Sequence, residues 1–233
     1  MMKRDETMNH IQIAIDGPAG AGKSTIAKLI AKKLNYIYID TGAMYRAITL
    51  KAMNLNIDLN DENSFNFVKK TKFKFINTLL FMDGVNVSKE IRETKVSNHV
   101  SLVSSHLSVR TNLVKMQQKM AKKHSVVMDG RDIGYKVLPN ADFKFFLTAS
   151  IKKRAERRYL DNLERKIESN LFTIEIEIER RDYLDTTRVH SPLKAADDAI
   201  KIDTSDLNIE QVVALITQTV REEENHGFWD EKS

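Results

Sequence analysis

The fold of this 233-residue chain is decided by the stretch "IAIDGPAGAGKSTIAKLIAKKL", residues 13–34. An apolar run predicts a buried strand at 11–16, and the residues that follow the glycines predict an amphipathic helix at 23–34. The apolar positions on one face of that helix are Ile26, Leu29, Ile30 and Leu34. Three glycines lie between strand and helix, where they let the backbone turn tightly and point N–H groups inward without a Cβ clash.

The turn matches the phosphate-binding loop pattern G-x-x-x-x-G-K-[ST] in full. Its residues are Gly17, Pro18, Ala19, Gly20, Ala21, Gly22, Lys23 and Ser24, with Thr25 next. In such a loop, backbone N–H groups and the helix N-terminus surround the phosphates of a nucleotide. Lys23 would reach the β- and γ-phosphates, and the hydroxyl of Ser24 can hold Mg²⁺. We therefore expect a nucleoside triphosphate site here.

Three classes of protein use this loop, namely kinases, GTPases and ATP-driven machines. A GTPase would need an N-K-x-D motif, and no asparagine in this sequence precedes a lysine. Motor and helicase ATPases are usually larger, so a small kinase is favoured. A kinase for any monophosphate stays open, and so does a nucleic-acid-binding ATPase. Against the latter, the lysine-rich segments lack the interleaved aromatic residues on which bases stack.

Composition narrows the class of protein further. The chain is 42% hydrophobic and 30% charged, as in folded globular proteins, and it contains no cysteine for a disulfide or a thiolate zinc site. No apolar run reaches the roughly 18 residues of a membrane span, and the N-terminus lacks the apolar core of a signal peptide. We therefore expect a cytoplasmic protein. Eight of its thirteen arginines lie between Arg131 and Arg188, which favours phosphate binding in that half.

The remaining sequence alternates apolar runs with helical patterns. Strands are predicted at 36–40, 125–130, 142–149 and 198–205, and helices at 43–54 and 208–223. This order predicts an α/β fold with a five-stranded parallel sheet and helices on both faces. Asp83-Gly84 predicts a hairpin within a small antiparallel insert at about 60–100, flanked by helices. The core would comprise 11–59 and 101–222, with loose termini at 1–10 and 224–233.

Several separated motifs agree in order and spacing with one family. They are "DTGAMYR" (40–46), "SKEIRE" (88–93), "VSLVSSHLSVR" (100–110), "MDGRDIG" (128–134), "RAERR" (154–158) and "RRDYLDTTR" (180–188). Over residues 11–222 the chain resembles the bacterial cytidylate kinases. The resemblance implies a monomeric enzyme that transfers the γ-phosphoryl group of ATP, with Mg²⁺, to CMP and dCMP. It also implies that the insert binds the monophosphate and that a short lid covers about 158–172.

The resemblance implies an acceptor site for CMP. Thr41, Tyr45 and Arg46 would hold the nucleotide, Arg131 and Arg188 its phosphate, and Arg181 and Asp185 its sugar. Ser101, Arg110 and Asp132 would recognise the base: a carboxylate accepts from the 4-amino group of cytosine, and uracil lacks that donor. From sequence alone, Thr41 could equally cap a helix, and Arg181 with Asp185 could form a surface ion pair. Arg92 ranks below these as a phosphate contact.

The resemblance also implies catalytic residues, which we take to be Lys23, Arg131, Arg157 and Asp129. Arg154, Arg157 and Arg158 lie in the stretch that leads into the lid. Arg154 and Arg158 would bind ATP, and we expect Arg157 and one neighbour to neutralise the transferred phosphoryl group. Asp129 follows a buried strand, where it would orient Mg²⁺-bound water or an arginine. The alternative is a buried acid satisfied by backbone N–H groups. The same two interpretations apply, with less weight, to Asp16.

Overall fold

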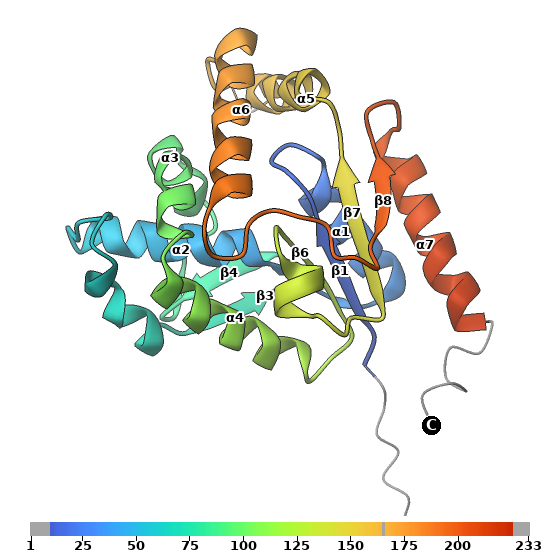
Figure 1. Ribbon diagram of the computed structural model, residues 1–233, viewed down its shortest axis with the longest axis horizontal. Helices are drawn as coiled ribbons and strands as arrows, with labels where there is room; N and C mark the ends of the chain where they lie inside the picture. Colours follow the sequence, from blue (N-terminus) through green and yellow to red (C-terminus); the bar gives the residue numbers. More distant parts are fainter. Residues whose placement is uncertain (1–9, 165, 226–233) are drawn as a thin grey trace, which may run out of the picture.

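A computed structural model describes residues 10–164 and 166–225. Its main sheet has five parallel strands in the order β2-β6-β1-β7-β8 (Figure 1). These strands are β1 (Gln12–Asp16), β2 (Ile37–Asp40), β6 (Val126–Gly130), β7 (Phe143–Thr148) and β8 (Ile200–Asp203). Each lies inside a predicted strand, so the predicted fold class is confirmed. Strand β1 lies at the centre, which places the loop after it between the ends of β6 and β7.

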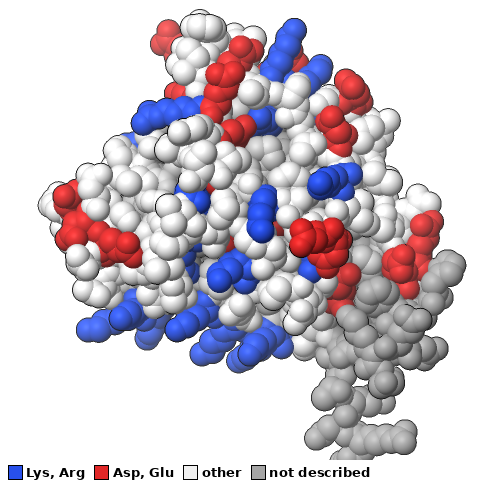
Figure 2. All heavy atoms as spheres, viewed as in Figure 1, with Lys and Arg blue, Asp and Glu red and all other residues white. Residues whose placement is uncertain are grey.

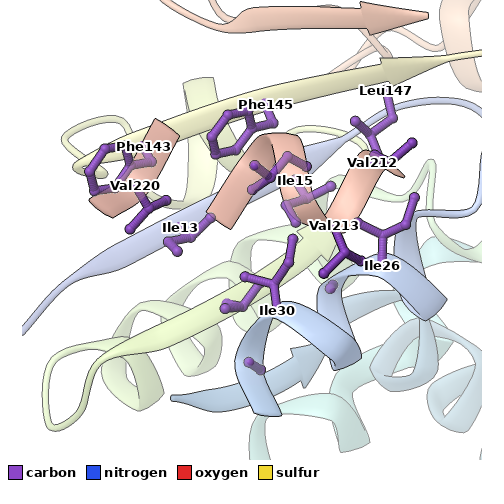
Figure 3. Close-up of a cluster of buried hydrophobic side chains, with 14 of the residues drawn as sticks. Ile13, Ile15, Ile26, Ile30, Phe143, Phe145, Leu147, Val212, Val213 and Val220 are labelled. Atoms are coloured by element: carbon purple, nitrogen blue, oxygen red, sulfur yellow. The ribbon is translucent and has the colours of Figure 1, made fainter. Parts of the chain in front are cut away.

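Helices cover both faces of this sheet. On one face, α1 (Lys23–Leu34) and α7 (Ile209–Asn225) pack their apolar side chains on β1 and β7 (Figure 3). On the other face, α2 (Thr41–Asn54) and α4 (Leu107–Ala121) pack close to the sheet. Helix α7 extends past the predicted end at 223, and the rest of the predicted loose termini, 1–9 and 226–233, lies outside the described residues.

The insert forms the antiparallel sheet that the sequence predicts, with three strands. Strands β3 (Phe73–Ile76), β4 (Leu79–Met82) and β5 (Val85–Asn86) form an antiparallel sheet. The predicted hairpin at Asp83-Gly84 joins β4 to β5, and a turn with Asn77 at a φ of 55° joins β3 to β4. Flanking it are η1 (Glu62–Lys70), η2 (Glu90–Arg92) and α3 (Thr94–Val103), so the boundary predicted at 100 falls inside α3.

Two further helices stand above the carboxyl ends of the strands. Helix α5 (Ile151–Glu164) leads from β7, and α6 (Leu171–Thr187) runs back toward the sheet beside α3 (Figure 1). The lid predicted at about 158–172 thus comprises the end of α5, the connecting segment and the start of α6. Among the described residues, no helix has both the length and the apolar character needed to cross a membrane.

The surface charge is uneven. On the face drawn in Figure 2, Lys and Arg side chains gather along the lower edge, where Figure 1 places α4 and the insert. The arginines discussed below lie instead at the carboxyl ends of the sheet strands, where most of them are largely withdrawn from solvent. The Lys and Arg side chains at the lower edge therefore form a solvated basic surface, whereas the arginines at the strand ends are placed where a ligand can bind.

Candidate functional site

The loop after β1 has a backbone that only glycine fits at its first position. Gly17 has a φ of +147°, and a Cβ there would lie 2.1 Å from the carbonyl oxygen of Leu147 on β7. Across the loop, Nζ of Lys23 donates a hydrogen bond to the carbonyl of Pro18 (2.6 Å). Burial, with Arg131 nearby, lowers the pKa of Lys23 well below its usual value. An anion in the loop would relieve that electrostatic cost.

Asp129 at the end of β6 connects the loop to two neighbouring elements. Its carboxylate accepts hydrogen bonds from Oγ of Ser24 (2.7 Å) and from the hydroxyl of Tyr38 (2.8 Å). Burial raises its pKa to about 6. It is therefore a buried acid satisfied by side-chain hydroxyls rather than by backbone N–H groups. Its oxygens and the hydroxyl of Ser24 are hard donors, the kind that Mg²⁺ prefers.

No group of three or more His, Cys, Asp or Glu side chains in the described parts of the chain could hold a metal ion. A Mg²⁺ ion held by Ser24 and Asp129 would complete its coordination with phosphate oxygens and water. That is the usual arrangement in sites that bind Mg²⁺ together with a phosphorylated substrate. The donor set of Ser24 and Asp129 fits such an ion.

A pocket opens beside this loop, and it contains every residue predicted for the acceptor site. The ten predicted acceptor residues among those that line it are Thr41, Tyr45, Arg46, Ser101, Arg110, Arg131, Asp132, Arg181, Asp185 and Arg188. Lys23, Ser24 and Asp129 line the same pocket, so the loop and the acceptor residues share one space. Residues separated by almost 150 positions are thus brought together at the carboxyl ends of the strands.

One end of the pocket is built around Asp132 and Arg110, both almost fully buried. The guanidinium of Arg110 pairs with the carboxylate of Asp132, donates to the carbonyl of Ser104 (3.1 Å), and lies over the ring of Tyr45. Arg188 lies 3.9 Å from the other oxygen of Asp132. The predicted base-recognition pair is therefore assembled, with Ser101 in the same wall.

The other end of the pocket concentrates positive charge. Nε of Arg131 donates to the carboxylate of Asp185 (2.9 Å). Asp185 therefore pairs with Arg131, and the alternative of a surface ion pair between Arg181 and Asp185 is wrong. Burial, and then the charge of Arg131, lowers the pKa of Arg181 to about 10. Cations crowded in this way are stabilised when an anion binds between them.

Five polar groups in the pocket walls are buried without a hydrogen-bond partner among the described residues. They are the hydroxyl of Tyr45, Nε of Arg46, Nε of Arg110, Nε of Arg181 and one terminal nitrogen of Arg188. A buried donor that is left unpaired costs about 1–3 kcal/mol. The pocket is therefore suited to a ligand rich in acceptor oxygens, such as a phosphorylated nucleoside.

The sequence left open whether Thr41 caps α2 or contacts the acceptor nucleotide, and in the structure its neighbour Asp40 provides the cap. Asp40 caps α2 by accepting from N–H of Ala43 (2.7 Å), and it also pairs with Arg46 (3.0 Å). The hydroxyl of Thr41 donates instead to the carbonyl of Asp129 (2.7 Å). Asp40 was not among the predicted pocket residues, although an aspartate directly before a helical pattern is a recognisable cap signal.

The three arginines near the lid have three different environments. Arg154 is buried, donates to the carbonyls of Ala149 (2.9 Å) and Ala19 (3.0 Å), and pairs with Asp182 on α6 (2.6 Å). Arg157 turns the other way, to the hydroxyl and carbonyl of Thr204 after β8.

Arg158 is the arginine of this group that faces open space. It lines a second hollow, between α3 and the pair α5–α6, together with Arg92 and Arg181. It lies 3.5 Å from Glu177 on α6. The structure thus brings Arg158 to a wall near the loop, while Arg157, the leading candidate from sequence, lines neither hollow.

Asp16, the last residue of β1, is almost fully buried. Its two carboxylate oxygens accept hydrogen bonds from N–H of Ile133 (2.8 Å) and of Gly134 (2.7 Å). It is thus the buried acid satisfied by backbone N–H groups that sequence left as an alternative.

Comparison with known proteins gives one consistent family. A family model described as "Cytidylate kinase" matches residues 13–222. A curated cytidylate kinase from Bacillus cereus (strain ATCC 10987 / NRS 248) is 52% identical over 215 residues, which cover 90% of this chain and 96% of that protein. One from Bacillus thuringiensis (strain Al Hakam) is 53% identical over 211 residues, covering 88% and 94%. The resemblance found in the sequence is confirmed.

Solved structures similar to this chain share its fold at low sequence identity. A gluconokinase from Sinorhizobium meliloti 1021 superposes with a TM-score of 0.50 at 15% identity, covering 95% of this chain and 98% of that one. An uncharacterized protein from Eubacterium ventriosum gives a TM-score of 0.51 at 13% identity, covering 92% and 99%. At this identity, the likeness concerns the arrangement of strands and helices alone.

Proposed function

Because this chain belongs to the cytidylate kinase family, we propose that its pocket transfers the γ-phosphoryl group of ATP to CMP. The products are CDP and ADP, and dCMP is the second acceptor. One observation carries the assignment to this pocket: all ten predicted acceptor residues line one space beside Lys23 and Ser24. Five residues that line it each carry a buried polar group without a hydrogen-bond partner, which a bound nucleotide could satisfy.

The loop holds the donor in this proposal. Backbone N–H groups of residues 17–25 surround the phosphates of ATP, and Lys23 leaves the carbonyl of Pro18 to contact the β- and γ-phosphates. Ser24 and Asp129 would hold Mg²⁺ directly or through water. When bound, this ion neutralises charge on the β- and γ-phosphates.

Asp132 and Arg110 identify the base. The carboxylate of Asp132 accepts a hydrogen bond from the 4-amino group of cytosine, and Arg110 donates to the acceptors at N3 and O2. The pair is already joined in the structure, so its geometry is set before the base arrives. Uracil carries a carbonyl where cytosine carries the amine, and it would face an acceptor with no donor to offer.

The charged end of the pocket holds the phosphate and sugar of the acceptor. Arg46 and Arg131 contact the phosphate, Arg188 reaches it from its place beside Asp132, and Arg181 and Asp185 contact the sugar hydroxyls. An oxygen of the acceptor phosphate attacks the γ-phosphorus, and the bond from that phosphorus to the β-bridging oxygen breaks. Catalysis then consists of alignment and charge neutralisation, without a covalent enzyme intermediate.

Arg158 is the arginine we assign to the transferred group from the lid side. It faces the hollow between the lid helices and α3, and that hollow shares Gly20, Ser24 and Arg181 with the wall around the loop. Closure of the lid over this hollow would exclude water that otherwise hydrolyses ATP. We further propose that the enzyme acts as a monomer and needs no nucleic acid partner.

The test is a coupled ADP-release assay with ATP and CMP, dCMP, UMP or AMP. We expect turnover of CMP and dCMP, a lower kcat/KM for UMP, and the lowest for AMP. Equal or faster turnover of AMP would contradict the cytidine assignment. Salt-dependent binding of RNA or DNA without turnover of any monophosphate would favour a nucleic-acid-binding ATPase instead.

A further inference from the structure

Asp132 occupies an unusual position for a residue that recognises a base. It precedes η3, a π-helical turn at Ile133–Val137, at the place where an aspartate normally caps a helix. Its side chain nevertheless makes no capping hydrogen bond. Its carboxylate pairs with Arg110 and faces Arg188 in the pocket.

The cap for this turn comes from another strand. Asp16 lies opposite Gly130 in the pairing of β1 with β6, one strand away from the start of the turn. Both of its carboxylate oxygens are used, one on N–H of Ile133 and the other on N–H of Gly134. These are the first two N–H groups of the turn, which have no partner within it.

Without Asp16, these two buried N–H groups would need another acceptor. The carboxylate nearest to them along the chain is that of Asp132, and aspartate at this position is a preferred cap. Capping by Asp132 would withdraw its oxygens from Arg110 and from the base. Asp16 therefore caps the turn, and this leaves the carboxylate of Asp132 free to face the base.

We propose that Asp16 is a positioning residue for base recognition, acting through the turn that carries Asp132. The inference rests on the proposed function, in which Asp132 contacts cytosine. Asp16 is also the residue directly before Gly17, so it links the loop that binds ATP to the turn that recognises the acceptor. Because its oxygens are saturated by backbone N–H groups, it is not itself a catalytic residue.

The experiment compares kcat/KM for CMP and for UMP in wild type and in Asp16→Asn at about pH 8. Asparagine keeps the shape of the side chain but replaces one acceptor oxygen with an amide donor. We expect KM for CMP to rise and the CMP/UMP ratio of kcat/KM to fall about tenfold, because a small displacement of a contact is costly. KM for ATP should stay within about twofold of wild type, since the loop keeps its own contacts.

Asp198→Asn is the matched control. Asp198 is an exposed aspartate that pairs with Lys144, and the Lys144 side chain approaches Gly134 from the side. The same chemical change there should leave the CMP/UMP ratio unchanged. If Asp16→Asn does not fold, Asp16→Ser keeps one small acceptor and must lower the ratio as well.

A double-mutant cycle with Asp132→Asn separates positioning from a general effect on structure. If Asp16 acts through Asp132, adding Asp16→Asn to Asp132→Asn should not lower the CMP/UMP ratio further. Additive losses, an unchanged ratio in folded Asp16→Asn, or an equal rise in KM for ATP would each overturn the inference. A wild-type enzyme without preference for CMP would instead contradict the proposed function.

Discussion

In the proposed function the phosphate loop and the acceptor pocket both bind phosphate groups, yet they are built from different parts of the chain. The loop is one continuous segment, residues 17–25, in which backbone N–H groups of a glycine-rich turn are the proposed phosphate ligands. The pocket takes side chains from α2, α3, α4, the turn after β6 and α6. One sequence motif defines the loop, whereas the residues of the pocket come together only when the chain folds.

This difference predicts how each region tolerates change. A loop made of backbone has one conformation, so a substitution that blocks it removes the whole site. A pocket made of side chains distributes its contacts over several arginines and four acids, so each substitution removes one contact. We expect losses in the loop to be nearly complete and losses in the pocket to be graded and specific for the part of the nucleotide contacted.

Gly17→Ala should give the largest effect. The new Cβ would lie 2.1 Å from the backbone carbonyl of Leu147, which belongs to a central strand and cannot move aside. We expect kcat/KM to fall by about 10³-fold or more, because the phosphate-binding N–H groups are displaced together.

Gly84→Ala is the control for this loss, since Gly84 also has a positive φ but nothing within 4 Å of a new Cβ. That variant should cost about 1–2 kcal/mol of stability and retain its activity. Near-normal activity of folded Gly17→Ala would show that the loop tolerates change as the pocket does.

Arg158→Ala should lower kcat by about 100-fold, because the transferred phosphoryl group would lose one neutralising charge. Arg157→Ala is the matched comparison, one residue away on the same helix, where the guanidinium contacts Thr204 and Leu207. We expect it to lower the melting temperature while kcat changes only a few-fold. If Arg157→Ala lowered kcat more than Arg158→Ala, the phosphate contact would belong to Arg157. The lid side of α5 would then have to rearrange.

Asp132→Asn tests the graded behaviour of the pocket. An amide can present either oxygen or nitrogen to the base, so discrimination between CMP and UMP should shrink by roughly 30-fold, with CMP turnover reduced. KM for ATP should change little, because the loop contacts are untouched. Unchanged selectivity in a folded variant would show that the base is recognised by other residues.

The sequence predicts the sheet well because each strand is a short apolar run followed by a polar turn, a local signal. It predicts the hairpin at Asp83-Gly84 for the same reason, but not the turn at Asn77, which lacks the glycine that usually marks one. The predicted boundary at residue 100 falls inside α3, which runs from Thr94 to Val103.

The candidate site shows the same contrast between features with a local sequence signal and features that depend on packing. The loop is predictable from eight residues, while the acceptor residues were found through family motifs, and their gathering in one pocket depends on the strand order. No short sequence pattern predicts that Arg158 faces the hollow, and none predicts that Asp16 caps the turn after β6. Both depend on how helices and strands pack, which a single sequence does not state.

Asp16 lies at the junction of the two regions, and the last effect we predict concerns its contribution to stability rather than turnover. Burial raises its pKa from 3.8 to about 7; the charge of Asp132 adds to this, while two backbone hydrogen bonds and Lys23 oppose it. Between these two pKa values the folded chain keeps a proton that the unfolded chain has released. The contribution of Asp16 to the free energy of unfolding is therefore highest below the lower value and falls as pH rises toward about 7.

Asp16→Asn removes this titration, so the stability of wild type relative to the variant should be greater at about pH 5 than at about pH 8. Urea unfolding of both proteins at the two pH values measures the difference, with equal slopes required for the comparison. A pH-independent difference would mean that Asp16 stays ionised throughout, held by the two N–H groups. The turn that carries Asp132 would then be fixed to the phosphate loop at every pH, and the two regions would act as one unit.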